Sequence, residues 1–539
     1  MHRSNGSPED RSKTAGADFL QLDPSEAPVG GLAAWLARRL RQAIADGRLP
    51  VGSRLPATRL LAADLRVSRG VVTDAYRRLT EEGRIAGRGR GGTVVVDPFA
   101  QSPAPPPSPA HSARPAPPGS TARLASPAHP PNGRRTRPRP HAPATTRAAV
   151  PRPGSPFDEA PVPASFETLR AAPARIDLSP GVPDLAAFPR AAWLRAERAV
   201  LHDLGAQDFG YGDPRGTPAL RRAVADWLGR NRGIRADPED VLIVAGAAQA
   251  LALAGEVLRA VGLDAVAVED PGSLGTRQHL GHRITDTPPV PVDAEGIRVD
   301  ALRATGARAV LLTPAHQFPT GVVLGGARRR ELLQWAADGG LVIEDDYDSE
   351  HRYDRPPVPA LRGVLPEQVL HLGSVSKLLA PALRTGWMLA PARYRDLLVD
   401  AKRLSDLGNA VLPQLVLARL MDSGALERHL RLLRPRHRRR RDAMTAAVGA
   451  HLPGAVVHGA AAGLHLMVTF PGGLNCTDTE FAAAALAHGV KVQPLSWHAR
   501  LPHPPGLVLG YAAGVPGEIE EGVAVLGRLL REARRPLPG

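Results

Sequence analysis

The chain has 539 residues, enough for two or three domains, which excludes a peptide hormone or a single small module. Its formal net charge of +15 favours a polyanionic partner, and its one cysteine, Cys476, excludes an intrachain disulfide and a cysteine-based metal site. No apolar run reaches the roughly 18 residues of a membrane helix, so we expect a cytoplasmic protein that holds no metal and has no membrane partner.

Three zones of composition predict the domain organisation. Residues 1–29 are polar and are expected to form a disordered tail, and residues 30–97 read as a compact folded module. Residues 98–165 are rich in Pro, Ala and Arg and contain 20 of the 55 prolines, which predicts a disordered linker. Residues 166–539 alternate apolar strands with amphipathic helices, the pattern of a large α/β domain.

The N-terminal module reads as three short helices. An apolar residue at every fourth position predicts a helix over Gly31–Ala45. Thr58 is placed to cap a second helix, and Ser68 is placed to cap a third helix over Arg69–Glu82. The side chains expected on the buried side of the second helix are Leu60, Leu61 and Leu65.

A basic glycine-rich tip and a β-branched run follow, in residues 84–96. They predict two short strands and therefore a winged helix-turn-helix. The segment resembles the GntR-type DNA-binding domain, with Val67-Ser68-Arg69 at the recognition helix, and the resemblance implies operator double-stranded DNA as the partner. The residues expected to meet this DNA are Arg59, Ser68, Arg69, Thr73, Arg88 and Arg90. The alternative is a solvated basic face, with Arg59 in an ion pair within the module.

The C-terminal part is predicted to contain a parallel sheet covered by helices. Its expected strands are residues 241–245, 265–269, 309–313, 341–344 and 369–372. An open α/β sheet binds its ligand at the carboxyl ends of the strands. We therefore expect the ligand-binding and catalytic residues in the loops that follow these strands.

One lysine stands at such a strand end. Lysine occurs only at positions 13, 377, 402 and 491, and arginine, which supplies the other basic residues, cannot form a Schiff base. Lys377 follows one predicted strand and precedes Arg384, whose guanidinium suits a phosphate. Pyridoxal phosphate (PLP) needs both groups and an acid at its ring nitrogen. Asp345 follows another predicted strand, with Tyr347 in reach of the ring hydroxyl.

These residues resemble those of the aspartate-aminotransferase-like, fold-type I PLP proteins, over residues 176–530. The resemblance implies a Schiff base between Lys377 and PLP, and a homodimer in which Tyr211 reaches the phosphate across the interface. The other cofactor-binding residues that it implies are Asp345, Tyr347, Ser374, Ser376, Arg384, Gly246, Ala247, Ala248, His316 and Gln317.

Two features depart from that family's pattern. Ser273 stands where the family commonly has an aromatic residue that stacks on the pyridine ring, so PLP affinity is reduced or another ring substitutes. The late strand, residues 506–511, has no arginine for a substrate carboxylate. This argues against efficient transamination of an ordinary amino acid, unless Arg277 or another arginine serves instead.

The two domains in this order resemble the MocR subfamily of GntR regulators. The resemblance implies a transcriptional regulator whose aminotransferase-like domain senses PLP or a small amino compound through an aldimine at Lys377. Two alternatives are an active PLP-dependent aminotransferase that carries a DNA-binding domain, and a plain DNA-binding repressor with a purely structural large domain. The arginine run in residues 434–441 is interpreted as a solvated helix face rather than a second nucleic-acid patch.

Overall fold

The computed structural model describes residues 20, 22–28, 30–46, 48–89, 92–96, 156–157, 161, 164–353 and 358–534. Most of the predicted tail, residues 1–29, and most of the predicted linker, residues 98–165, lie outside these ranges. Within the tail, residues 24–26 form a 3-10 turn and Leu20 packs in the core of the N-terminal module. In the described residues, no helix is long and apolar enough to cross a membrane.

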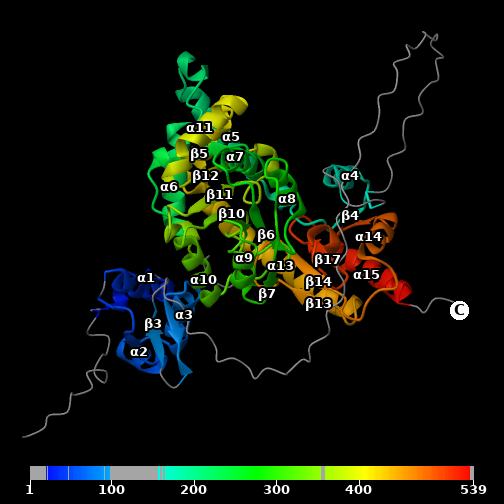
Figure 1. Cartoon of the computed structure of the whole chain (residues 1–539), viewed down its shortest axis with the longest axis horizontal. Coiled ribbons are helices and arrows are strands. Elements are labelled where there is room, and N and C mark those ends of the chain that lie inside the picture. The colour runs from blue at the N-terminus through cyan, green and yellow to red at the C-terminus, as the bar shows by residue number, and fades with distance from the viewer. Residues whose placement is uncertain are drawn as a thin grey trace, which may run out of the picture. The chain divides into compact units, whose positions relative to one another are not determined.

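The N-terminal part, blue in Figure 1, consists of three helices and a small antiparallel sheet in the order β1-β3-β2. Its elements are η2 (Pro24–Glu26), α1 (Leu32–Ala45), β1 (Arg54–Leu55), α2 (Thr58–Asp64), α3 (Arg69–Glu81), β2 (Ile85–Gly87) and β3 (Thr93–Val95). The helices share one apolar core, which includes Leu36, Leu61, Val72 and Leu79. The predicted winged helix-turn-helix is confirmed.

Two local predictions in this part were wrong. Thr58 does not cap α2, because it is the first helical residue and the cap position is Ala57, which makes no side-chain bond. Leu60 is 63% exposed. Because α2 has only seven residues, the face that carries Leu61 and Leu65 fills the core, and Leu60, about 100° around the helix from Leu61, points away.

The large domain is built on an eight-stranded sheet in the order β5-β12-β11-β10-β9-β6-β7-β8. Its strands are β5 (Val241–Val244), β6 (Val266–Asp270), β7 (Pro289–Asp293), β8 (Gly296–Ile297), β9 (Ala309–Leu312), β10 (Leu341–Asp346), β11 (Val369–Ser374) and β12 (Gly386–Leu389). The central strands are parallel, and β12 runs antiparallel to both of its neighbours. All five predicted strands are present, and their residues are buried on both faces, as expected where helices cover a sheet on both sides.

Helices cover both faces of this sheet (Figure 1). Apolar side chains of α7 and α11 pack on one face, while those of α9 and α10 pack on the other. The helices of this layer are α5 (Arg190–Asp203), α6 (Pro218–Arg232), α7 (Ala247–Ala260), α8 (Leu274–Gly281), α9 (Val299–Ala304), α10 (Gly326–Ala337), α11 (Ala392–Asp406) and α12 (Val411–Asp422). Short 3-10 turns lie between them: η4 (Leu185–Ala187), η5 (Ala206–Phe209), η6 (Pro238–Asp240), η7 (Leu361–Gly363) and η8 (Pro381–Leu383).

A second, smaller sheet in the order β13-β14-β17-β16 lies near the C-terminal end of the chain, with the pair β4 and β15 beside the same core. The elements of this part of the chain are α4 (Ser165–Ala171), β4 (Ile176–Asp177), α13 (Ala425–His451), β13 (Val456–His458), β14 (His465–Thr469), α14 (Asp478–Ala487), β15 (Val490–Lys491), β16 (Gln493–Pro494), η9 (Leu495–His498), β17 (Gly506–Gly510) and α15 (Pro516–Ala533). The predicted architecture, a winged helix-turn-helix followed by a large α/β domain, is confirmed.

Candidate cofactor site and DNA-binding face

Lys377 and Asp345 meet at the carboxyl edge of the large sheet. Strands β10 and β11 are parallel neighbours, with Asp345 level with Leu372, and Lys377 follows three residues after the end of β11. Lys377 Nζ donates a hydrogen bond to the carbonyl oxygen of Gly181. Burial lowers the pKa of Lys377, against the opposing pull of Asp348 and Asp345. A lowered pKa favours the neutral amine, which is the nucleophilic form.

Asp345 is a buried carboxylate without a hydrogen-bond donor. It is 7% exposed, and no described residue donates a hydrogen bond to it. Burial, followed by repulsion from Asp346 and Asp348, raises its pKa to about 7. A buried carboxylate is costly unless a cation or donor pairs with it. The site therefore fits a group that brings its own N–H, as a protonated pyridine ring does.

Tyr347, His316 and Asp348 form a buried hydrogen-bonded group beside Asp345. His316 Nδ1 lies 3.0 Å from Tyr347 Oη and 2.8 Å from Asp348 Oδ2, and His316 Nε2 has no partner in the described structure. Burial would raise the pKa of Asp348, but His316 holds it below the ordinary value. Burial and the charge of Asp348 raise the pKa of Tyr347 well above 10, so its hydroxyl stays protonated. The sequence did not single out Asp348.

The first turn of α7 forms a cradle suited to a phosphate. Gly246 precedes the helix with φ +81°, and the N–H groups of Ala247 and Ala248 bond to no acceptor in the described residues. The Arg384 guanidinium donates to the Ala245 carbonyl, and a Cβ on Gly246 would stand 3.2 Å from its Nη1. Free N–H groups and the helix dipole attract an anion here.

Two serines lie on the lysine side of the cradle. Ser374 Oγ accepts a hydrogen bond from Ser376 N at 3.0 Å, and the two hydroxyl oxygens are 2.8 Å apart. Ser374 is the last residue of β11, the strand that leads to Lys377, and Ser376 lies between this strand and the lysine. The predicted phosphate residues are thus gathered at neighbouring strand and helix ends.

A supporting network behind the cradle was missed by the sequence analysis. Gln249 accepts from Ala245 N at 2.7 Å and donates to Asp406 at 2.7 Å. The fully buried ammonium of Lys402 donates to both oxygens of Asp406 and to Asn409. Because the Ala245 N–H is bonded to Gln249, it is not available to a phosphate, and the same bond holds the start of α7 in place. Gln249 and Asp406 are 157 residues apart, so local sequence carried no signal of their pairing.

Gln317 orders the loop after β9 through its side chain. Its amide nitrogen donates to the carbonyl oxygens of Pro271 and Phe318. Its amide oxygen accepts from the backbone N–H and from the hydroxyl of Thr320. Gln317 is 1% exposed. Its hydrogen-bonding groups are used within the protein, so it shapes the loop beside the ring position.

The opposite wall is largely apolar or aromatic. Ser273 caps α8 through its hydroxyl, which accepts from Thr276 N. Arg277, the candidate for a substrate carboxylate, donates instead to the carbonyl oxygens of Gly272, Trp497 and His498. The late strand is β17, as predicted, and its central Val508 is fully buried against Phe318 and two aliphatic neighbours. His465 completes this wall, with its ring centroid 4.8 Å from that of Phe318.

Tyr211 lies apart from this site within a single chain. Its side chain is 97% exposed, and Phe209 beside it is 61% exposed. Together the two neighbouring rings present apolar surface to solvent that a partner subunit could cover. The structure therefore does not bring Tyr211 together with Lys377 in one subunit.

The predicted DNA-binding residues lie on the outside of the winged helix. Arg59, Arg69, Thr73 and Arg88 are exposed, and in the described residues none of the three arginines has an ion-pair partner. The alternative of an Arg59 ion pair is thus not seen. Ser68 Oγ accepts from Val71 N at 3.4 Å and caps the recognition helix. Arg90 lies outside the described residues.

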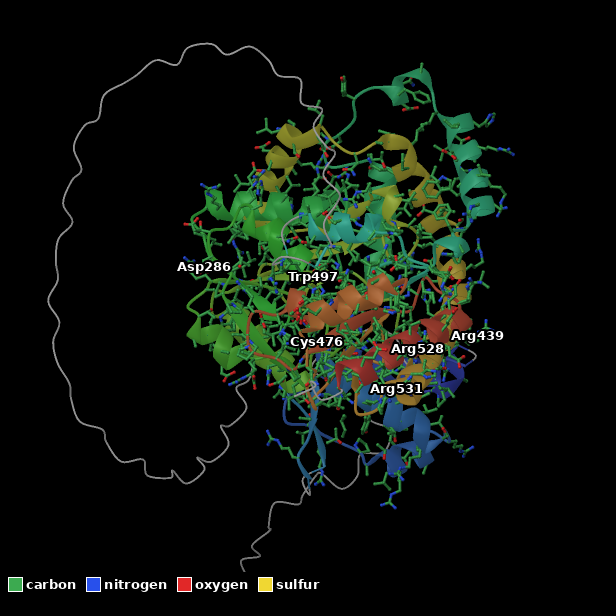
Figure 2. All side chains as sticks on the ribbon, turned by 90° about the vertical axis from the view of Figure 1, so that its right-hand side faces the viewer. Asp286, Arg439, Cys476, Trp497, Arg528 and Arg531 are labelled. Atoms are coloured by element: carbon green, nitrogen blue, oxygen red, sulfur yellow. The ribbon has the colours of Figure 1, made fainter. Side chains whose placement is uncertain are left out.

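The arginine run 434–441 lies on α13. Arg436 and Arg440 both pair with the buried Asp184 at 2.8 Å, while Arg438 and Arg439 are exposed. Arg439 is labelled in Figure 2. Part of this run therefore holds the domain together, and part faces solvent.

Two family models match the chain. Residues 32–95 match "Bacterial regulatory proteins, gntR family", and residues 174–526 match "Aminotransferase class I and II". The chain is 31% identical to the probable rhizopine catabolism regulatory protein MocR of Rhizobium meliloti, over 90% of this chain and 91% of that protein. It is 31% identical to the pyridoxine biosynthesis transcriptional regulator PdxR of Corynebacterium glutamicum, over 80% and 82% of the two chains.

Solved structures of aminotransferases resemble the large domain. The kynurenine aminotransferase of Pyrococcus horikoshii gives a TM-score of 0.63 at 28% identity, covering 69% of this chain and 94% of that one. The α-aminoadipate aminotransferase LysN of Thermus thermophilus gives 0.62 at 29% identity, covering 68% and 94%. It was solved with a phosphopyridoxyl derivative of leucine.

Proposed function

The chain belongs to the MocR subfamily of GntR-type transcriptional regulators, and we propose that it binds operator DNA through its winged helix and PLP through Lys377. The cofactor of its aminotransferase-like domain is PLP. We propose further that PLP itself or a small amino compound is the effector, and that the protein acts in the cytoplasm as a homodimer on DNA.

The meeting of Lys377, Asp345 and the first turn of α7 carries this proposal. A half-buried amine, a buried carboxylate without a donor and a helix start with open N–H groups fit the aldehyde, the ring nitrogen and the phosphate of PLP. When bound, PLP supplies an electrophilic carbon and an electron-withdrawing ring. Asp345 then holds the ring N–H, and Tyr347 donates to the ring oxygen. The phosphate residues in this proposal are Gly246, Ala247, Ala248, Ser374, Ser376 and Arg384, while His316 and Gln317 order the loop beside the ring.

Regulation is favoured over aminotransferase activity by the apolar late strand. Val508 and its neighbours offer no positive charge to a substrate carboxylate, and Arg277 is occupied by three carbonyl oxygens. The two relatives named above, which match over 90% and 80% of this chain, are regulators by name. Steady-state turnover with an amino donor and a keto acid would support the aminotransferase alternative.

The proposed homodimer is supported by the exposed aromatic pair. A partner subunit that covers Tyr211 and Phe209 would remove their apolar surface from water, worth about 1.5 to 3 kcal/mol for a fully buried aromatic side chain. Tyr211 would then add its hydroxyl to the partner's phosphate cradle.

The absorption spectrum of the protein with PLP tests the proposal, in wild type and Lys377→Ala. We expect a near-visible band that depends on Lys377 and that borohydride makes permanent. Duplex DNA binding of Lys377→Ala without PLP should match wild type, since the lysine lies in the large domain. Absence of the band in wild type would refute PLP attachment, and equal loss of DNA binding would refute the separation of roles.

A further inference from the structure

Helix α4 packs against the aromatic wall of the cofactor site, although it stands more than 200 residues before Lys377. The ring of Phe166 lies 5.7 Å from Trp497 (labelled in Figure 2) and 6.4 Å from His498, and it packs 3.4 Å from the Cβ position of Gly275 on α8. Rings then continue inward, from His498 to Phe318 at 5.0 Å and to His465 at 4.8 Å. This row connects α4 with the group around His316.

The C-terminal end of α4 is anchored beside the loop that holds Lys377. The buried ammonium of Lys491 donates to the Arg170 carbonyl at 3.1 Å and lies 3.6 Å from Asp177 on β4. The chain continues from β4 to Gly181, which accepts the hydrogen bond of Lys377. The positive charge of Arg170 acts on Lys377, adding to the effect of burial in lowering its pKa.

Arg170 has little to hold it in place. Its guanidinium pairs with Glu167 at 2.8 Å and donates to the Phe166 carbonyl oxygen at 3.3 Å, and the Arg170 and Glu167 side chains are 70% and 63% exposed. A surface pair of this kind is worth only about 0 to 1 kcal/mol, so a ligand oxyanion can replace Glu167 at little cost.

The other arginines around the site are already engaged. Arg277 bonds to three carbonyl oxygens, Arg384 lies at the phosphate cradle, and Arg440 pairs with Asp184. Of these four described arginines, Arg170 is the one whose guanidinium ends in a solvent-exposed ion pair, on a helix whose backbone is held by Lys491.

We propose that Arg170 binds the acidic group of the amino effector, which makes the effector a primary amine that also carries an oxyanion such as a carboxylate. Arg170, in the first helix of the large domain, then binds the carboxylate. The late strand has no arginine for this role and carries Val508 at its centre. The inference rests on the proposed function, because the amine of the effector is taken to react at the PLP held by Lys377.

Pairs of L-amino acids and their decarboxylated amines test the inference, since the members of each pair differ only in the carboxylate. Each is titrated into the PLP-loaded full chain, and the change in the absorption band gives an apparent affinity. We expect the best wild-type pair to favour the acid about 10- to 100-fold, the effect of a charged hydrogen bond. Arg170→Gln should bring the ratio close to one and leave the affinity for the amine unchanged.

Arg175→Gln is the matched control. Arg175 is an exposed arginine on the same segment, but it pairs with Glu521 on α15. It should keep the wild-type ratio, and Glu167→Gln should raise the affinity for the acid about 2- to 5-fold, because it removes a competing carboxylate. An unchanged ratio in Arg170→Gln, or no preference in wild type, would overturn the inference. A missing wild-type band would instead overturn the proposed function, and this inference with it.

Discussion

Replacing Asp345 with asparagine should stabilise the PLP-free protein, and more at high pH than at low pH. Burial and two neighbouring carboxylates raise the pKa of Asp345 to about 7 from its ordinary 3.8. The folded state therefore holds the proton more tightly than the unfolded state, and the free energy of unfolding falls as the pH rises from about 4 to about 7. At about 1.4 kcal/mol for each pH unit, the carboxylate costs about 4 kcal/mol at pH 8. The cost is about 3 kcal/mol smaller at pH 5.

Urea unfolding at pH 5 and pH 8, followed by near-ultraviolet circular dichroism, measures this effect. The gain in unfolding free energy of Asp345→Asn over wild type should be about 3 kcal/mol larger at pH 8 than at pH 5. Glu269 also has a pKa raised to about 7 by burial, so the difference between the two proteins is diagnostic and the wild-type curve alone is not. Asp226→Asn, at an exposed position, is the control. A gain that is the same at both pH values would refute the reasoning.

Three further predictions concern the site and the DNA face. Asp348→Asn should weaken PLP binding about 10-fold in equilibrium dialysis, because the buried His316 loses its carboxylate; unchanged affinity would contradict this. Gly463→Ala should lose PLP binding, since a Cβ there would stand 1.9 Å from His316 Cε1, while Gly449→Ala, in open space on α13, should keep it and gain up to about 1 kcal/mol of stability in thermal melts. Arg69→Ala should make the slope of log affinity for duplex DNA against log salt shallower by about 1 in anisotropy titrations, and an equal slope would argue against a phosphate contact.

Elements with a local signal were predictable from the sequence. The apolar runs at 341–344 and 369–372 became β10 and β11, and the order of Asp345 and Lys377 along them already indicated a shared edge. The end of β10 was placed two residues too early. Acidic residues rarely lie in a core, so Asp345 and Asp346 read as loop, although both are 7% exposed within the strand.

Contacts between distant segments carried no such signal. His316 and Asp348 are 32 residues apart, and nothing in either segment indicates that their side chains are hydrogen-bonded. Helix α4 was not predicted: Ser165 was assigned to the linker and the next six residues to the start of the large domain, where the sequence analysis expected no helix. Its place at the cofactor site depends on Phe166 packing against Trp497, more than 300 residues later.

The rarity of lysine is itself informative about this chain. Three of its four lysines lie in the described residues, and each donates its ammonium to an oxygen inside the large domain: Lys377 to Gly181, Lys402 to Asp406 and Lys491 to Arg170. Lys402 and Lys491 are 0% and 5% exposed. A compact ammonium fits such enclosures, whereas a guanidinium is flat and much wider. This protein uses arginine for nearly every other positive charge. Its lysines therefore indicate narrow sites in the large domain, where substitution by arginine would disrupt the packing.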